Sequence, residues 1–408
     1  MKRAIFAGAS LRALNMFVGP MVEEYGDYYK PAGIYDINPK RARYIGSRYQ
    51  IPVYDDFSEM LNKNSGATVI VTTVDAFHHE YIIKSLRAGF DVITEKPITI
   101  DAEKANAILA AERESGKNLT VTFNYRYMPY TTRIKELISG GAVGDVFSVH
   151  FEWMLDCNMD VLAHGTSYFR RWNRYMQKSG GLLVHKSTHH FDMINWIIND
   201  TPAFVSAFGE LRRYGANGGY RGDNCRSCAH SNECEFFYDI TKNEFEMEFY
   251  VGAEDEDGYF KDGCVYAEDI DIYDTMAVNV RYAKGALLSY SLNAHSPYEG
   301  WRMSINGSKG RLEAFFPETG PLSDIKKHTI CLYDLSNQLT TVDIPCDVKN
   351  HGGGDTRLLR DLFIGNEQDP LGHHAGSQAG VNSIIIGIAA NKSIREQKII
   401  SVDSLLQR

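Results

Sequence analysis

The sequence predicts an α/β protein with two domains: an N-terminal doubly wound parallel sheet, and a C-terminal α/β domain with a large, open, mostly antiparallel sheet. Three observations lead to this prediction. The first 123 residues alternate short apolar runs with stretches of helical spacing, the pattern of parallel strands joined by helices. From about residue 146, most segments alternate apolar and polar residues, as half-buried strands do. The length of 408 residues also fits two domains better than one.

The elements of the first domain, residues 1–123, follow one another closely. Each predicted strand is a short apolar run bounded by turn or polar residues, and each helix has its apolar residues on one face. Strands are predicted over residues 3–7, 32–35, 67–72, 91–94 and 119–122. Helices are predicted over residues 11–24, from Pro39 onward, and over residues 79–88 and 102–115.

The second domain, residues 124–408, is predicted to hold hairpins and a few helices, with a Cys-rich insertion at about residues 213–266. Short turns separate the two strands of each hairpin. The hairpin strands are predicted over residues 276–282 and 286–292, 303–306 and 311–314, and 330–335 and 339–344. Helices are predicted over residues 130–139, 188–198, 355–362 and 378–394.

Composition and charge exclude several classes of partner. The chain has 43 Lys and Arg against 52 Asp and Glu, a net charge of −9 with His neutral. This acidity disfavours binding to nucleic acid or to an anionic membrane surface. No run of eighteen apolar residues is present, and the apolar run at residues 4–8 is too short for a signal peptide. We therefore expect a cytoplasmic protein that binds neither nucleic acid nor a membrane.

A glycine turn joins the first predicted strand to the first helix. The run from Gly8 to Ala13 fits the dinucleotide fingerprint Gly-x-Gly-x-x-Gly/Ala, except that Ser10 replaces the second glycine. A pyrophosphate would lie on the N-terminus of the helix that begins at Leu11, and Arg12 would add a positive charge. Gly8, Ser10, Leu11 and Arg12 are therefore predicted to bind a dinucleotide in a Rossmann fold.

Asp36 ends the second predicted strand, where a carboxylate accepts hydrogen bonds from the ribose hydroxyls of NAD. The same carboxylate would repel a 2′-phosphate, so NAD is favoured over NADP. Arg41 and Arg43 follow closely in the sequence and keep NADP as the second choice. Asn38, two residues after Asp36, is included among the cofactor contacts.

A charged pair, Glu95 and Lys96, follows the predicted strand over residues 91–94. It therefore lies at the carboxyl edge of the sheet, where doubly wound folds bind their ligands. Pro97 follows directly, and a cis bond before it would fix the direction of the lysine. An exposed turn with solvated charges is the alternative interpretation.

With these motifs, nearly the whole chain resembles the glucose–fructose oxidoreductase/inositol dehydrogenase/rhizopine catabolism (Gfo/Idh/MocA) family. The resemblance implies NAD(P)-dependent hydride transfer on a sugar or polyol, with the cofactor between the two domains. It also implies a homodimer or homotetramer formed through the outer face of the second sheet. Besides the glycine turn and Asp36, it rests on Thr73 and His78, Glu95-Lys96-Pro97, Asn124-Tyr125-Arg126-Tyr127, and Gly180-Gly181-Leu182-Leu183 followed by His189 and Asp192. With the resemblance, the predicted cofactor contacts also include Thr73, His78, Glu95 and Lys96.

Three histidines and a lysine lie close together in the run over residues 180–196, GGLLVHKSTHHFDMINW. Alcohol oxidation needs a base for the hydroxyl proton and a cation near the oxygen, and His189 and Lys96 supply these groups. If the helix begins at His185, that residue shares a face with His189, and Lys186 faces His189 as well. Asp192 is expected to orient His189 from one turn below. The predicted catalytic residues are Lys96, His185, Lys186 and His189.

His185 departs from the family, whose members carry an Asp four residues before the catalytic His. A histidine there raises the positive potential and lowers the pKa of its neighbours, which suits an anionic or enolate-like intermediate. A second hypothesis is therefore redox-assisted cleavage of a glycoside: oxidation at C3, deprotonation at C2 and elimination of the aglycone. A third is a non-catalytic NAD-binding sensor.

Arginine and aromatic residues near these motifs are candidates for binding a carbohydrate substrate, because rings stack on sugars and guanidinium groups donate paired hydrogen bonds. The alternative is that these residues pack at the seam between the domains. The predicted substrate contacts are Arg126, Tyr127, Arg170, Trp172 and His190.

Four cysteines lie in the insertion: Cys225, Cys228, Cys234 and Cys264. In a reducing compartment such clustering indicates a metal more often than disulfides, and four thiolates suit structural zinc. A zinc ion bound to these cysteines would hold the acidic stretch over residues 244–257 in place. His230 in place of Cys264, an iron–sulfur cluster, and free thiols are the alternatives.

Overall fold

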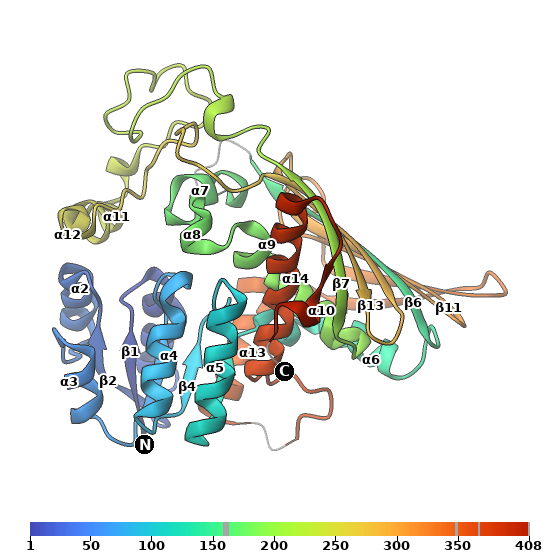
Figure 1. The fold of residues 1–408 in the computed structure, drawn as a ribbon, viewed down its shortest axis with the longest axis horizontal. Coiled ribbons are helices and arrows are strands. Elements are labelled where there is room, and N and C mark those ends of the chain that lie inside the picture. The colour runs from blue at the N-terminus through green and yellow to red at the C-terminus, as the bar shows by residue number, and fades with distance from the viewer. Residues whose placement is uncertain (158–162, 347–349, 366–367, 407–408) are drawn as a thin grey trace.

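The computed structural model describes residues 1–157, 163–346, 350–365 and 368–406, and it contains two β-sheets (Figure 1). The first sheet has five parallel strands in the order β2-β1-β3-β4-β5, so the predicted Rossmann sheet is confirmed. From β1 the chain adds β2 on one side and then crosses to add β3, β4 and β5 on the other, so the order of connection reverses between β1 and β3. The carboxyl ends of β1 and β3 form the expected ligand-binding edge. The strands are β1 Lys2–Ala7, β2 Tyr29–Tyr35, β3 Thr68–Val71, β4 Val92–Thr94 and β5 Leu119–Val121.

Both faces of the first sheet are buried. Phe6 and Ile70 belong to one apolar core, whereas their neighbours Ile5 and Val69 belong to the other, because successive side chains of a strand point to opposite faces. The sequence does not predict α3, whose buried apolar residues span only about one turn. The predicted helix over residues 11–24 is a π-helical turn, Ala13–Val18, that continues into α1. The helices are α1 Gly19–Glu23, α2 Pro39–Tyr49, α3 Phe57–Lys63, α4 His78–Arg87 and α5 Ala102–Ser115.

The second sheet has nine strands in the order β13-β12-β11-β10-β6-β9-β8-β7-β14. Only β6 and β9 pair in parallel, so the predicted large, mostly antiparallel sheet is confirmed. The three predicted hairpins are β8–β9, β10–β11 and β12–β13. The strands are β6 Val146–Asp156, β7 Pro202–Glu210, β8 Thr275–Tyr282, β9 Leu287–Ser296, β10 Gly300–Gly307, β11 Gly310–Pro317, β12 Lys327–Asp334, β13 Leu339–Pro345 and β14 Ile400–Ser401.

Helices cover one face of the second sheet, and α14 contacts both β7 and β5, so it packs against both sheets (Figure 1). The other face carries exposed apolar side chains, among them Phe208, which is 80% exposed, and Phe204. The homodimer or homotetramer predicted through this face stays a prediction. The main helices of this part are α6 Pro129–Ser139, α10 Thr188–Ile198, α13 Gly354–Phe363 and α14 Ser377–Glu396.

A long insertion separates β7 from β8 and extends away from the sheet (Figure 1). Its two short helices, α11 Glu244–Phe249 and α12 Glu254–Asp257, lie above α2 of the first domain. The first domain and the insertion are therefore in direct contact. Among the described residues, no helix is long and apolar enough to cross a membrane.

Candidate active site

The turn after β1 has the geometry that a dinucleotide needs. Gly8 has φ +107°, and a Cβ atom on it would lie 2.7 Å from the backbone carbon of Thr72. Only glycine therefore fits between the ends of β1 and β3. The Ser10 hydroxyl accepts a hydrogen bond from the N–H of Ala13 at 3.1 Å, so this side chain folds back onto the helix and leaves the turn narrow. Leu11 is half-buried beside it.

Asp36 is fixed at the end of β2 by the same turn. One carboxylate oxygen accepts the N–H of Ala9 at 2.6 Å, and the other accepts the N–H of Asn38 at 2.7 Å. Burial raises the pKa of Asp36, whereas these two hydrogen bonds lower it. Each oxygen keeps further lone pairs, so the carboxylate fits a pair of ribose hydroxyls.

Arg12 extends from the turn toward the next loops. Its Nε donates to Glu95 Oε1 at 2.8 Å, and its Nη1 lies 3.6 Å from Asp355. The guanidinium thus joins the turn after β1 to the loop after β4 and to α13. The predicted contact of Arg12 and Glu95 with the cofactor stays a prediction.

Lys96 lies two residues beyond β4, at the carboxyl edge of the first sheet. The Lys96–Pro97 peptide bond is cis, as the sequence predicts. The ammonium donates to the backbone oxygen of His185 at 3.0 Å, so the lysine crosses from the first domain to the second. Burial and the neighbouring charge of Lys186 lower the pKa of Lys96 to about 7, against the opposing effect of Asp75. Lys96 therefore holds its proton less tightly than an ordinary lysine does.

His78 holds two loops of the edge together. Its ring nitrogens lie 2.8 Å from the backbone oxygen of Pro97 and 3.0 Å from that of Thr73. Burial lowers the pKa of this histidine, and a neutral imidazole donates to only one of these two carbonyl oxygens at a time. His78 positions the loops after β3 and β4, while its predicted contact with the cofactor stays a prediction.

His185 does not begin the helix of His189. It ends the short helix α9, Leu182–His185, and the chain turns at Lys186 and Ser187 before α10 begins at Thr188. The condition for a shared helical face is therefore not met. His185 Nδ1 lies 2.5 Å from Asp75 Oδ2, and burial, with the charges of Lys96 and other cations, holds the pKa of this histidine well below its usual range. Asp75, in the loop after β3, thus places a carboxyl group beside position 185, and burial raises the pKa of that group.

His189 is buried at the start of α10, and its ring stacks on Tyr125 with centroids 4.6 Å apart. Burial and the charges of Lys96 and Lys186 hold its pKa well below the usual range, so the imidazole is neutral. Among the described residues its Nδ1 has no hydrogen-bond partner. A neutral imidazole has a nitrogen that can accept a proton, and the neighbouring lysine charges make this histidine a weaker base than a free one.

Asp192 does not orient His189, contrary to the sequence-based expectation. It forms a bidentate ion pair with Arg126 at 2.6 and 2.7 Å, and Arg126 Nη1 also donates to the backbone oxygen of Gly372. Asp192 turns away because a buried guanidinium needs a carboxylate more than a neutral imidazole does. Arg126 is only 6% exposed, so it braces α10 against the loop after β5.

Lys186 lies on the side of the cluster away from the first sheet. Its ammonium is 5.3 Å from the ring centre of Trp153, and its pKa is raised although burial opposes this, because Tyr168, Glu299 and Glu318 lie nearby. Glu299 pairs with His164 Nδ1 at 2.7 Å. Burial and the Glu299 charge raise the pKa of Glu318 to about 8, so this carboxyl is protonated at neutral pH.

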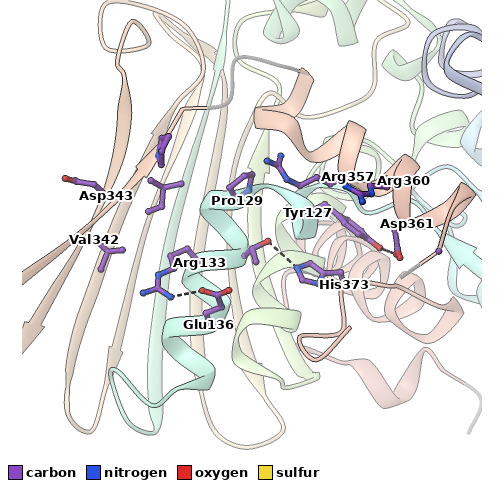
Figure 2. Close-up of a pocket in the computed structure, with 14 residues that line it drawn as sticks. Tyr127, Pro129, Arg133, Glu136, Val342, Asp343, Arg357, Arg360, Asp361 and His373 are labelled. Carbon is purple, nitrogen blue, oxygen red and sulfur yellow. Dashed lines mark hydrogen bonds and ion pairs between the residues drawn. The ribbon is translucent and has the colours of Figure 1, made fainter. Parts of the chain in front are cut away.

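The remaining predicted substrate residues are dispersed. Tyr127 lines a pocket of about 700 Å³ between α6, α13 and β13, and its hydroxyl donates to Asp361 at 2.5 Å (Figure 2). The residues that line this pocket do not include the Lys96–His189 cluster. Trp172 lies edge-on to His185 at 5.5 Å, and His190 is buried with its Nδ1 3.1 Å from the Tyr290 hydroxyl. Trp172 therefore contacts the side chain of His185, one of the predicted catalytic residues.

The structure does not support the predicted zinc site. Among the described residues, which include all four predicted ligands, no group of three or more His, Cys, Asp or Glu side chains could hold a metal ion. The Arg170 guanidinium donates to Cys225 Sγ at 3.1 Å and to the backbone oxygens of Gly263 and Phe236, so one of the four thiols lies beside a protein cation. Cys225, Cys228, Cys234 and Cys264 are free thiols. Arg170 therefore anchors the insertion instead of lying open for a substrate.

Three members of the cluster escape the sequence-based reasoning. Asp75 follows β3 by four residues, and its place at the carboxyl edge could have marked it. Tyr125 belongs to a motif of the family resemblance, but the motif alone does not indicate a role for its side chain. Glu318 lies beyond β11 in a loop with no motif, and only the three-dimensional structure brings it to Tyr125, whose hydroxyl lies 3.5 Å away.

Comparisons with known proteins agree with this geometry. The family model described as "Oxidoreductase family, NAD-binding Rossmann fold" matches residues 4–123, and the C-terminal alpha/beta domain model of the same family matches residues 135–402. YteT of Bacillus subtilis, which bears an oxidoreductase name, is 38% identical over 100% of this chain and 99% of its own.

An inositol 2-dehydrogenase of Rhizobium meliloti is 31% identical over 35% of this chain and 39% of its own. The WlbA dehydrogenase of Bordetella pertussis, solved with NADH and UDP-GlcNAcA, has a TM-score of 0.67 at 17% identity and covers 98% of this chain and 99% of its own. This last likeness shows the fold. The two family matches together span most of the sequence, and the chain belongs to the Gfo/Idh/MocA oxidoreductase family.

Proposed function

We propose that the protein oxidises or reduces a secondary hydroxyl of a sugar, polyol or glycoside by hydride transfer with NAD. The observation that carries the proposal is the cluster of half-buried Lys96 with buried, neutral His189 and buried Lys186 at the carboxyl edge of the NAD-binding sheet. Relatives named for inositol oxidation and a structural neighbour solved with a nucleotide sugar support a polyol or sugar as substrate.

The protein residues divide the work on the substrate hydroxyl. His189 takes the hydroxyl proton, and the Lys96 ammonium donates a hydrogen bond to the same oxygen as negative charge develops on it. Asp75, through His185, and the His185 backbone oxygen hold Lys96 in place. Bound NAD supplies the acceptor for the hydride. Trp172 is a proposed substrate contact. The proposed cofactor residues are Gly8, Ser10, Leu11, Arg12, Asp36, Asn38, Thr73, His78 and Glu95.

A second function is redox-assisted cleavage of a glycoside, and Glu318 is the observation that favours it. The pKa of this carboxyl is raised to about 8, so it can give a proton at neutral pH. In this reaction a C3 ketone acidifies the C2–H bond, a base removes that proton, and the C1–O bond breaks. The departing aglycone oxygen takes a proton, water then adds to the sugar, and the ketone is reduced again.

Proton NMR in deuterated water, with NAD and a panel of glycosides and polyols, separates these functions. A ketosugar formed in step with NADH, with any glycosidic bond intact, supports the dehydrogenase. Deuterium at C2 with aglycone release on catalytic NAD supports the cleavage. The K96M variant should abolish either product, whereas K104M, at a half-buried lysine on α5, should not. Activity that survives in K96M contradicts the assigned role, and a protein that turns over no substrate favours the NAD-binding sensor.

A further inference from the structure

The helical part of the insertion is fastened to the proposed cofactor domain beside Asp36. We call Glu244–Asp257, from the start of α11 to the end of α12, the clasp. The Asn38 side chain donates to the backbone oxygen of Ala253 at 2.9 Å, and Lys40 pairs with Asp255 at 2.6 Å. Figure 1 shows the clasp directly above α2, the helix that follows β2 and Asp36.

An apolar contact supports these polar links. Tyr44 of α2 lies edge-on to Phe249 and Phe245 of the clasp, with ring centroids 5.2 and 5.9 Å apart. Phe249 is fully buried in the core that also contains Ile34 of β2. The clasp is therefore part of the packed structure around the end of β2 and is not a loose surface loop.

The last residue of the clasp, Asp257, pairs with Arg41 on the first turn of α2. The side chains of Arg41 and Asp257 are only 12% and 17% exposed, so water screens the pair little. Both act on Asp36: after burial and two backbone hydrogen bonds, Arg41 lowers its pKa and Asp257 raises it. Arg41 Nη1 is buried and, among the described residues, has no hydrogen-bond partner.

This arrangement changes what Arg41 can do. A guanidinium beside the ribose-binding carboxylate is the group that would bind the 2′-phosphate of NADP, since its paired donors match phosphate geometry. Here a carboxylate from the insertion already holds that guanidinium. A 2′-phosphate arriving beside Asp36 would meet two carboxylates and one neutralised cation.

We infer that Asp257 is a specificity-determining residue that selects NAD over NADP by occupying Arg41. The inference rests on the proposed NAD-dependent function, but it concerns a residue of the insertion and not the strand-end Asp36. It also gives the acidic clasp a chemical role: the negative charge on Asp257 is placed where it discriminates between two cofactors that differ by one phosphate.

The test is binding of NAD and of NADP, measured by calorimetry without any carbohydrate, so that an error in the substrate assignment leaves it valid. The wild type should bind NAD at least about tenfold more tightly than NADP. D257N, which keeps the side-chain shape, should tighten NADP binding by about tenfold or more and change NAD binding less than about threefold, because Arg41 regains a charged partner in the phosphate.

D255N is the matched control, because it removes the same charge from α12 at a 69% exposed side chain that pairs with Lys40. It should leave the ratio of the two affinities unchanged. In the double variant R41M/D257N the tighter binding of NADP should disappear, because it depends on the charge of Arg41.

Three results would overturn the inference: a wild type that binds NADP as tightly as NAD, a D257N variant with the wild-type ratio, or equal shifts in D257N and D255N. The double variant R41E/D257R exchanges the two charges and so keeps an ion pair between α2 and the clasp. It serves as a second test if D257N weakens the attachment of the clasp. Its ratio should stay within about threefold of the wild type, and a tenfold loss of NADP affinity would show that Arg41 already serves the phosphate.

Discussion

The carboxyl edge of the first sheet and the insertion after β7 both gather charged and reactive side chains, but they do so by different means. At the edge, Lys96 and Asp75 follow the ends of β4 and β3, so the backbone ladder of the sheet sets their positions. In the insertion, side chains do this work, with Arg170 and Arg226 bonded to distant segments. Substitutions at the edge should therefore change chemistry, whereas those at the arginines that hold the insertion in place should change stability.

The largest expected effect is on catalysis by the edge. K96M should lower kcat/KM by about a thousandfold, because it removes the donor to the reacting oxygen. The thermal midpoint should stay within a few degrees, since the sheet, and not this side chain, holds the loop. Steady-state kinetics and thermal unfolding of K96M and K104M check both statements. A K96M variant that does not fold would contradict the expectation that substitutions at the edge change chemistry and not stability.

The next effect is on the stability of the insertion. R170M should destabilise the protein by about 3 kcal/mol, because it leaves two buried backbone oxygens without donors. Denaturant unfolding with limited proteolysis measures this loss and locates it between β7 and β8. R221M, which removes an exposed insertion arginine paired with Glu268, should cost less than about 1 kcal/mol. Equal losses in the two variants would mean that Arg170 is not the anchor.

Glu318 sharpens the comparison through pH. Its pKa is raised from 4.5 to about 8, so the folded state binds more protons than the unfolded state between these values. Its contribution to stability is present at low pH and is lost as pH rises through about 8. The wild type should lose about 3 kcal/mol more than E318Q between pH 5.5 and 8.5. Unfolding curves at both pH values test this, with E313Q on β11 as the half-exposed control.

Lys96 should give a milder pH effect on rate. With its pKa near 7, the lysine is a cation below this pH and a neutral amine above it. If it acts as a charged donor, kcat/KM for alcohol oxidation should fall about tenfold per unit above pH 7. An arginine stays charged, so K96R should be slower overall but lack this decline. A wild-type rate that rises through pH 7 would instead make Lys96 the base.

The smallest effect is expected for the cysteines. Cys228 is half-buried and accepts only a weak backbone contact from His230 at 3.4 Å. C228S should therefore change the free energy of unfolding by less than about 1 kcal/mol. The midpoint should also be the same with and without a chelator. A loss of stability as large as that of R170M would show that the cysteines hold the insertion in place.

The sequence predicts the parts of the site that adjoin regular structure. Lys96, Gly8 and Asp36 follow strands whose apolar pattern is strong, and α10 spans the predicted residues 188–198. The break before α10 is less visible, because Gly181, at φ +72°, starts a separate turn that carries His185 off the axis of α10. Spacing within a sequence does not reveal such a change of direction.

What the sequence does not predict depends on partners that are distant along the chain. Asp192 meets Arg126 from the loop after β5, and Cys225 meets Arg170, so each group has a charged neighbour that its own motif does not contain. The pKa of Glu318 is raised because this carboxyl is buried and because the pairing of β10 with β11 brings it beside Glu299. Such pairings follow from the packing of whole elements.

The central place of β6 has a consequence for how the chain folds during its synthesis. This strand begins at Val146, but its partners β9 and β10 begin at Leu287 and Gly300. At about 5–20 residues per second, a ribosome needs roughly ten seconds or more to deliver them. Throughout that interval both edges of an eleven-residue apolar strand stay unpaired. The second domain therefore completes its core only late in translation, when the first domain has long been able to fold.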